Sequence, residues 1–377
     1  MPNPRPEQSL NPKTTPWCNY RACQNDHVPN LRFLRGYNDA VVLGLARSGA
    51  MTRVELAERS GLTPQAVSKI VNRLIGDGLL LESGTRNVGV GKPRTLLKLA
   101  ADRRLALGAQ VERDELRVVL ADLAGDVVGR AVAPLPPGFG PDAFVAELAA
   151  LADRLRTPDV EERLLGLGIG FVGPLDHRTG TVLDPNGLAG WTEVPLRDLA
   201  EKRLGLPVVV DKDTNAAIVA ESWRRGEELR DAVLVWVGTG LGAGLLLDGR
   251  VHRGARTNAG EFGHTSIRLD GPPCVCGRAG CAEAVHNAAA TRGDLGAATT
   301  AVGVAVAGLV QVLDVERVVL AGRAVLAQPE AYAEGVRYHL PKHDWLVVDV
   351  EVTPLGDDLV AAGAAMLVLS EFYGRPR

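Results

Sequence analysis

One histidine and three cysteines form the group of residues with the most specific chemistry in the sequence. His264 is followed by Cys274, Cys276 and Cys281 in the turn-rich segment GPPCVCGRAGC. One imidazole and three thiolates match the closed tetrahedral ligand set of a structural Zn²⁺ ion, which leaves no position for a reactive water. We therefore predict a zinc ion that fixes the loop after the segment GEFGH, residues 260–264. The alternative is three unrelated buried thiols.

A second group of polar residues repeats along one face of a predicted helix that begins near residue 64. Thr52-Arg53-Val54-Glu55 is a capping box that begins one helix, and Thr63 and Pro64 begin the next after a short turn with Gly61. Apolar residues of the second helix recur at intervals of three and four, so a separate polar face is left for base edges and phosphates. Two helices joined in this way indicate a helix-turn-helix. The residues on this helix that we predict to meet DNA are Thr63, Gln65, Ser68, Lys69 and Asn72.

The segment that follows is basic and rich in glycine. GTRNVGVGKPRT, residues 84–95, is predicted to form a wing whose Arg86, Lys92 and Arg94 meet phosphate or the minor groove. Residues 31–100 carry 11 Arg and Lys against 5 Asp and Glu, a charge of +6, while the rest of the chain is about −9. This asymmetry favours a DNA-binding module at residues 31–100 attached to an acidic body. The alternatives are chance clustering of charge and a small helical scaffold with a solvated polar face.

The overall composition is typical of a globular protein of two or three domains. Of 377 residues, 46% are apolar and 23% charged. We find no apolar run of the roughly 18 residues that a membrane span needs, and no secretory signal in MPNPRPEQSLNPK, so we expect a cytoplasmic protein without a membrane partner. Five cysteines, an odd number, argue against a disulfide framework. Residues 1–30 contain six prolines and are expected to form a mobile tail.

After about residue 104, strands alternate with helices, which predicts an α/β body over residues 101–377. A meander of three strands begins it and a second strand pair follows midway, so we expect two related lobes. Strands are predicted at 105–111, 116–123, 127–133, 164–171, 207–210, 232–237, 243–248, 317–322 and 345–352. Helices are predicted at about 142–156, 196–204, 214–228 and 298–313, and from about 358.

Several of these segments together resemble the ROK family of repressors, open reading frames and kinases. The resemblance covers the chain from about residue 38 to its end and implies an actin-like, two-lobed ATPase fold with sugar bound in the cleft, behind a winged helix-turn-helix. GEFGH and CVCGRAGCAE (274–283) resemble the two signature segments of the family, and the spacing from histidine to cysteine fits its zinc site. The other matching segments are DKDTNAA (211–217), the second phosphate-binding turn GTGLGAG (238–244), and NGLAGW (186–191), which closes over the sugar.

The resemblance implies a set of sugar-binding residues. Carboxylates accept pairs of hydrogen bonds from vicinal hydroxyls, and an imidazole can donate or accept. In an active kinase of the family, the residue that matches Asp213 is the general base that activates the sugar hydroxyl. Helix capping or solvation of surface acids is the alternative role for these side chains. The implied sugar ligands are Asn186, Asp213, Glu261, His264 and Glu283.

Three departures from the family pattern bear on the function. Family kinases carry Asp-x-Gly-Gly-Thr in the first strand pair, where this chain has Gln110-Val111-Glu112-Arg113-Asp114. Without the glycines the backbone cannot approach the ATP phosphates, and two acids would repel them, so we expect no kinase activity. Lys212 stands where the family has Asn, and it would neutralise Asp213 or select an acidic or phosphorylated ligand. Only about 36 residues separate Glu283 from Leu320, fewer than is usual in the family.

Three functional hypotheses follow from these residues. The one we favour is a non-enzymatic regulator, a repressor of sugar metabolism genes. It would act as a homodimer or dimer of dimers, in which a sugar or sugar derivative changes the fit of the recognition helices to a double-stranded DNA operator. The sign of the ligand's effect is open. The second is an ATP-dependent sugar kinase with a fused DNA-binding domain, and the third is a DNA-binding protein whose body only dimerises.

Overall fold

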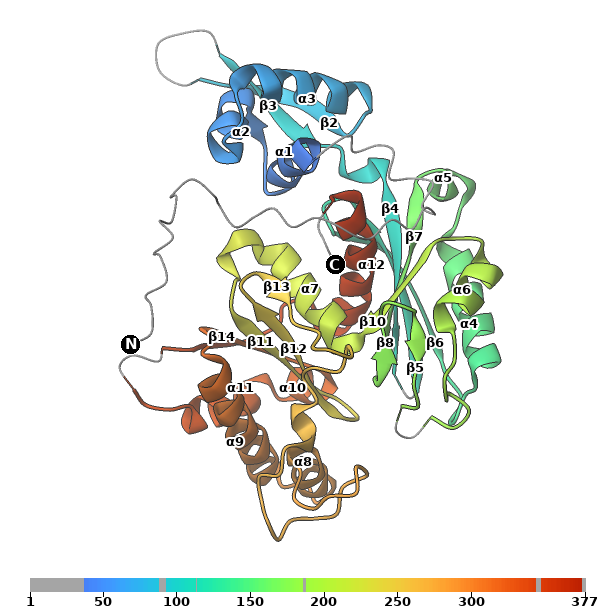
Figure 1. Ribbon diagram of the computed structural model, residues 1–377, viewed down its shortest axis with the longest axis vertical. Coiled ribbons are helices and arrows are strands. Elements are labelled where there is room, and N and C mark those ends of the chain that lie inside the picture. Colours follow the sequence, from blue (N-terminus) through green and yellow to red (C-terminus); the bar gives the residue numbers. More distant parts are fainter. Residues whose placement is uncertain (1–36, 88–92, 113, 186–187, 344–346, 375–377) are drawn as a thin grey trace, which may run out of the picture.

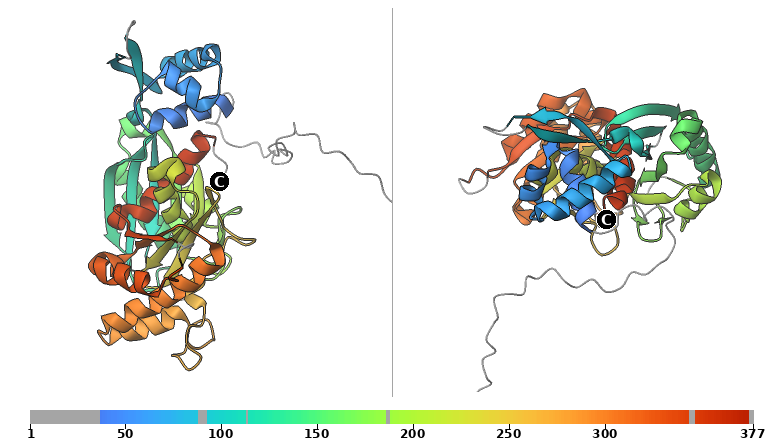
Figure 2. Two further views of the ribbon diagram at one scale, coloured as in Figure 1. Left: turned by 90° about the vertical axis from the view of Figure 1, so that its left-hand side faces the viewer. Right: turned by 90° about the horizontal axis from the view of Figure 1, so that it is seen from above.

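A computed structural model describes residues 37–87, 93–112, 114–185, 188–343 and 347–374 (Figure 1). The predicted tail at residues 1–30 lies outside the described residues, as do three residues with predicted roles, Lys92, Arg113 and Asn186. The molecule has a small head, from α1 to β3, at one end of a larger body with two lobes (Figures 1 and 2). The predicted boundaries between the tail, the DNA-binding module and the body, at residues 30 and 100, stay predictions.

The head is a winged helix-turn-helix in which local hydrogen bonds set the helix ends. The predicted capping box is confirmed, because Thr52 Oγ1 accepts the Glu55 N–H at 3.3 Å and Glu55 Oε2 accepts the Thr52 N–H at 2.7 Å. Thr63 likewise caps the next helix by accepting the Ala66 N–H at 3.3 Å. Its three strands form a sheet in the order β1-β3-β2. The bounds are α1 Tyr37–Arg47, β1 Met51–Thr52, α2 Arg53–Ser60, α3 Pro64–Gly76, β2 Leu80–Arg86 and β3 Arg94–Leu99.

Two five-stranded sheets with the same connectivity form the two lobes of the body, which confirms the expectation of related lobes. In lobe 1 the order is β10-β7-β4-β5-β6, and in lobe 2 it is β13-β12-β11-β14-β15. Each sheet consists of an antiparallel meander followed by two strands parallel to its first strand. The strands of lobe 1 are β4 Leu105–Val111, β5 Glu115–Asp122, β6 Val127–Pro134, β7 Leu164–Phe171 and β10 Val208–Lys212. Those of lobe 2 are β11 Ala232–Val237, β12 Leu241–Leu247, β13 Arg250–Val251, β14 Arg317–Ala321 and β15 Asp349–Val352.

Helices cover the outer faces of both sheets. In lobe 1 these are α4 Pro141–Leu155, α5 Pro158–Glu161 and α6 Leu196–Leu204, and in lobe 2 they are α8 Ala282–Thr291, α9 Leu295–Leu313, α10 Arg323–Ala327 and α11 Pro329–His339. Of these, α5, α8, α10 and α11 were not predicted from the sequence. The predicted strand at 345–352 begins later than expected, at Asp349, and residues 344–346 lie outside the described part.

Helix α9 corrects one expectation from the sequence. It is long and apolar enough to cross a membrane by length and composition, although no such run was expected. Its Val302, Val306 and Val310 are fully buried in one cluster with the strand residues Val233 and Val318 of lobe 2. Packing in the core of lobe 2 therefore accounts for the apolar composition of α9.

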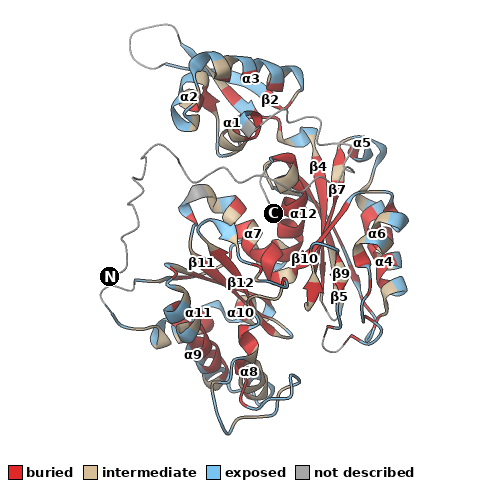
Figure 3. Ribbon diagram, in the orientation of Figure 1, coloured by how far each residue is buried: buried red, intermediate tan, exposed pale blue. Residues whose placement is uncertain are grey.

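Two helices, α7 (Asp213–Arg225) and α12 (Leu359–Phe372), lie side by side between the two sheets. Both are largely buried (Figure 3). Glycines allow the backbones to approach closely: a Cβ on Gly168 of β7 would lie 1.8 Å from Ala364 O of α12, and a Cβ on Gly363 would lie 1.8 Å from Ala216 O of α7. Because α12 packs on lobe 1 and α7 on lobe 2, any movement between the lobes has to pass through this helix pair.

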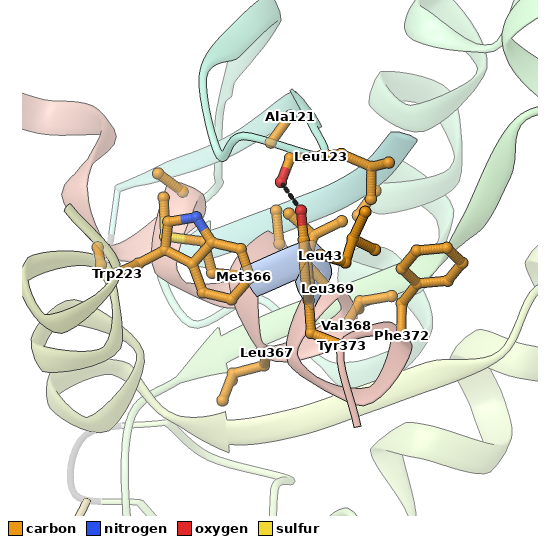
Figure 4. Close-up of a cluster of buried hydrophobic side chains, with 14 of the residues drawn as sticks. Leu43, Ala121, Leu123, Trp223, Met366, Leu367, Val368, Leu369, Phe372 and Tyr373 are labelled. Atoms are coloured by element: carbon orange, nitrogen blue, oxygen red, sulfur yellow. Dashed lines mark hydrogen bonds between the residues drawn. The ribbon is translucent and has the colours of Figure 1, made fainter. Parts of the chain in front are cut away.

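The head and the body share one hydrophobic core. Leu43 of α1 belongs to the same buried cluster as Phe372 and Tyr373 at the end of α12 (Figure 4). The Tyr373 hydroxyl donates to Leu123 O at 2.8 Å, which fixes this end of α12 on lobe 1. On the other helix, the Arg47 guanidinium of α1 lies 4.4 Å from the centre of the Trp223 ring and donates to Trp223 O at 2.7 Å. The head therefore contacts the far ends of both α7 and α12.

We predict that Gly363→Ala strongly destabilises the body, because the added methyl group overlaps Ala216 O of α7. Overpacking of this kind should lower the free energy of unfolding by about 2 kcal/mol or more. Gly308→Ala on α9 is the matched control, since a Cβ there meets no atom within 4 Å. It should be neutral or gain up to about 1 kcal/mol of helix propensity. Urea unfolding followed by circular dichroism measures both, and equal stabilities of the two variants would contradict the close packing.

Candidate functional sites

A cavity between the lobes brings together four of the five predicted sugar ligands. Asp213, Glu261, His264 and Glu283 all line it, and Asn186 lies outside the described residues. Asp213 is the first residue of α7, directly after β10, and Glu283 lies in the first turn of α8. Glu261 directly precedes the short helix η3 (Phe262–His264), and His264 is the last residue of that helix. Residues far apart in the sequence thus present three carboxylates and one imidazole to a single cavity.

Hydrogen bonds hold two of these carboxylates in place. Glu283 Oε2 accepts the Leu241 N–H at 2.8 Å and so ties α8 to the turn that begins β12. Glu261 Oε1 lies 2.5 Å from the Lys212 ammonium, which also donates to Ala259 O at 3.2 Å. Lys212 is only 3% exposed. We expected Lys212 to neutralise Asp213 or to select an anionic ligand; its charge does lower the pKa of Asp213, and its ammonium forms an ion pair with Glu261. A lysine already paired in this way is poorly placed to bind an anion.

Asp213 has an unusual protonation equilibrium for a carboxyl group. Burial raises the pKa of Asp213 to about 6, although the Lys212 charge and a hydrogen bond from the Thr214 N–H oppose this increase. The negative charges of Glu261 and Asp211 raise the pKa further. The carboxyl group is therefore ionised at neutral pH but titrates close to it, as is common for functional acids in clefts.

The turn between β4 and β5 closes one end of the cavity with polar side chains. Gln110 and Glu112 line the cavity, and Gln110 Nε2 donates to Glu112 Oε1 at 3.0 Å. On lobe 2, Arg323 pairs with Glu112 and Asp114. Sequence patterns did not single out Arg323, although its place after the buried strand β14 is a signal, because side chains at the carboxyl ends of parallel strands often form sites.

The predicted metal ligands converge on one point in lobe 2. The ligand atoms of His264, Cys274, Cys276 and Cys281 all lie within 4.8 Å of one another. His264 Nδ1 and Cys274 Sγ are 3.4 Å apart, and the Sγ atoms of Cys276 and Cys281 are 3.6 Å apart. A tetrahedral ion with the bond lengths of zinc to nitrogen and sulfur would separate its ligands by roughly 3.5–3.8 Å. The side chains present therefore fit a tetrahedral metal ion.

On the head, the polar face of α3 is open to solvent. Thr63, Gln65, Lys69 and Asn72 are exposed and Ser68 is half-buried, whereas the apolar face of α3 is buried in the head. The Asn72 carboxamide accepts a hydrogen bond from Arg53 at 2.9 Å, and Arg94 is exposed at the start of β3. The Arg86 guanidinium pairs with Glu55 at 2.6 Å and so connects the wing to α2, and its contact with DNA stays a prediction. Lys92 lies outside the described residues.

The fold and the cleft define a class of protein: a winged helix-turn-helix joined to a two-lobed, sugar-kinase-like body. Sequence comparison agrees. The model of the ROK family matches residues 107–298, half of the chain, and a winged helix-turn-helix DNA-binding model matches residues 45–80. The chain belongs to the ROK family.

Both repressors and kinases are among the proteins that the chain is similar to. It is 30% identical over 259 residues to the xylose repressor of Caldicellulosiruptor bescii, an alignment that spans 67% of this chain but only 64% of the repressor. A ROK family transcriptional regulator, described as a homolog of the E. coli MLC protein, has the same fold, with a TM-score of 0.70 and 22% identity over 90% of this chain and 97% of that chain. The ROK hexokinase of Thermus thermophilus is 28% identical, with a TM-score of 0.58 over 70% of this chain and 97% of the hexokinase.

We predict that Asp213→Asn stabilises the protein at neutral pH. A carboxyl group whose pKa is raised by folding costs stability once it ionises, and this cost falls as the pH drops from about 6 towards the ordinary value of 3.8. The gain should be about 1–3 kcal/mol at pH 7.5 and roughly half of that at pH 5.0. Thermal unfolding at both pH values measures it, with the exposed Asp198→Asn on α6 as control. A variant no more stable than the wild type at pH 7.5 would show that the Asp213 pKa is not raised.

Proposed function

We propose that this protein is a DNA-binding transcriptional regulator, a repressor of sugar metabolism genes, whose effector is a sugar or sugar derivative. One observation carries the proposal: Asp213, Glu261, His264 and Glu283 line one cavity, in a chain that also presents a basic winged helix-turn-helix. Carboxylates and an imidazole suit a polyhydroxylated ligand, and sites of this kind reject analogues that lack the matching hydroxyl. We assign Asn186 to the same ligand. The similarity to a xylose repressor supports the proposal.

We further propose that the cleft binds its ligand without phosphorylating it. Glu112 and Arg113 stand where family kinases have the two glycines that approach ATP, Asp114 follows them in the sequence, and both acids are paired with Arg323. Like charges would repel the phosphates. The pairing of Lys212 with Glu261 favours an uncharged ligand over an acidic or phosphorylated one.

The metal in our proposal is a structural Zn²⁺ ion held by His264, Cys274, Cys276 and Cys281. When bound, the ion would supply a fixed crosslink and no catalysis. A ligand bond through His264 Nδ1 would leave its Nε2–H as a hydrogen-bond donor, and His264 lines the cavity. The metal site would therefore orient one ligand-binding side chain.

Helices α7 and α12 supply the route from the cavity to the head. Helix α7 begins at Asp213 in the cavity and carries Trp223, which contacts Arg47 of the head, in its last turn. Helix α12 ends at the aromatic residues that pack against Leu43. A ligand that favours one arrangement of the lobes would shift α7 relative to α12, and the head would move with them. In the homodimer or dimer of dimers that we propose, this would change the spacing of the two α3 helices and their fit to a palindromic operator. We place the protein in the cytoplasm, without a membrane partner.

A second candidate function is an ATP-dependent sugar kinase with a fused DNA-binding domain. The position of Asp213 in the cavity favours it, as does the similarity to a hexokinase. Consumption of ATP in the presence of a sugar panel would decide in its favour.

The test of the proposed function is binding of the purified protein to the DNA upstream of its own operon, with and without sugars. We expect specific binding at fixed salt, altered by at least one member of a panel that includes D-xylose and D-glucose. Lys69→Ala should weaken binding about three- to tenfold on both the upstream DNA and a scrambled duplex, because it removes a contact to phosphate. Lys202→Ala on α6 is the matched control on the body. Fluorescence anisotropy measures all of these, and a protein that ignores its own upstream DNA in every condition would refute the proposal.

For the metal, we predict about one zinc ion per purified chain and less than about half of that in Cys276→Ser, because three ligands hold the ion weakly. The melting temperature should fall by several degrees. Cys23→Ser is the control, since this cysteine lies outside the ligand group. Metal analysis by mass spectrometry gives the content, and a wild type without a stoichiometric metal would contradict the assignment.

A further inference from the structure

Arg323 belongs to lobe 2, but its side chain pairs with lobe 1. It is the first residue of α10, directly after β14. Its Nε lies 3.0 Å from Glu112 Oε2 and its Nη1 lies 2.9 Å from Asp114 Oδ2. Both acids lie in the turn between β4 and β5 of lobe 1. One guanidinium group therefore connects the two lobes next to the cavity that Asp213 and Glu112 line.

The surrounding backbone holds Arg323 at this position. Gly322 has a φ of +96°, and a Cβ there would lie 2.5 Å from Val237 O at the end of β11. Only a glycine lets the chain pass this close to β11 before Arg323. From lobe 1, the Gln110 carboxamide holds Glu112 through a hydrogen bond of 3.0 Å. Both sides of the contact are thus built into the fold.

The positive charge of Arg323 lies between the negative charges of Glu112 and Asp114. Burial raises the pKa of Glu112, and the Arg323 charge opposes that increase. Hydrogen bonding to Arg323 lowers the pKa of Asp114 and raises that of Arg323 itself. A guanidinium between two carboxylates is the arrangement that makes Arg effective in ion pairs that connect separate elements.

We propose that Arg323 is a positioning residue that holds the two lobes together across the cleft, through Glu112 and Asp114, without the help of a nucleotide. The turn between β4 and β5 carries two acids and lacks the glycines that a phosphate-binding turn would need, so a nucleotide could not bridge the lobes there. The ion pairs of Arg323 supply that connection instead. This inference rests on the proposed function, because it concerns the cleft in which the sugar would bind. The contact between the lobes can nevertheless be measured without any ligand.

The test is hydrogen–deuterium exchange of the full-length protein without sugar. In Arg323→Glu, the backbone amides of Glu112 and of Gly240–Gly242, all of which line the cavity, should exchange about three- to tenfold faster than in the wild type. The second change Asp114→Arg restores an opposite charge pair and should return the exchange to near the wild-type rate. Arg317→Glu is the matched control, because Arg317 also pairs with two acids, Asp349 and Glu351, but within lobe 2.

Several outcomes would overturn the proposal. These are unchanged exchange in Arg323→Glu, equal acceleration by Arg317→Glu, and failure of Asp114→Arg to restore the wild-type rate. If Arg323→Glu does not fold, Arg323→Gln and Arg323→Lys replace it, and the lysine variant should lie closer to the wild type. Small-angle scattering should also give a larger radius of gyration for Arg323→Gln. Titration with D-glucose and D-xylose separates the role of Arg323 from the proposed function. If neither sugar binds the wild type but the exchange rates of the variants behave as expected, the role of Arg323 is supported and these two sugars are excluded as effectors.

Discussion

The packing of α7 against α12 is the physical constraint on which the rest of this structure depends. Each helix belongs to a different lobe, and glycines bring their backbones so close that a single methyl group at Gly363 would overlap Ala216 O. Interiors packed this tightly do not deform continuously but move between discrete arrangements. The two lobes can therefore change their relation only if α7 shifts relative to α12 from one discrete arrangement to another. Since both helices end at the head, such a shift also changes the position of the head.

Helix α7 connects the cleft to the head directly. Asp213 opens α7, in a place where burial makes the charge of its carboxylate costly. A ligand hydroxyl that donates to this carboxylate would offset part of that cost, and the proposed ligand would then act on the first residue of a helix. Trp223, in the last turn of the same helix, lies beneath Arg47 of α1. A single helix, α7, therefore has the buried carboxylate of Asp213 at one end and the contact of Trp223 with the head at the other.

The sequence predicted the elements with strong local patterns and the residues with specific chemistry. The strands at 105–111, 164–171 and 232–237 have the predicted bounds, and the capping box at Thr52 is present as predicted. Helix α8 was missed, because its sequence AEAVHNAAAT is rich in alanine and has no clear apolar periodicity. The convergence of Asp213, Glu261, His264 and Glu283 on one cavity agrees with the family resemblance. What could not be predicted were pairings that depend on tertiary structure: Lys212 with Glu261, Arg86 with Glu55, and Arg323 with the β4–β5 turn.

Thermodynamic linkage between the effector and DNA tests the central claim most directly. If α7 and α12 couple the cleft to the head, an effector that changes operator affinity by some factor must have its own affinity changed by the same factor when operator DNA is bound. Calorimetric titration of the effector into free and DNA-bound protein measures this factor. Our account predicts a factor different from one in the wild type, and in Arg47→Ala a factor that falls towards one while effector and operator each still bind. A coupling factor unchanged in Arg47→Ala would contradict the route through Trp223 and α7.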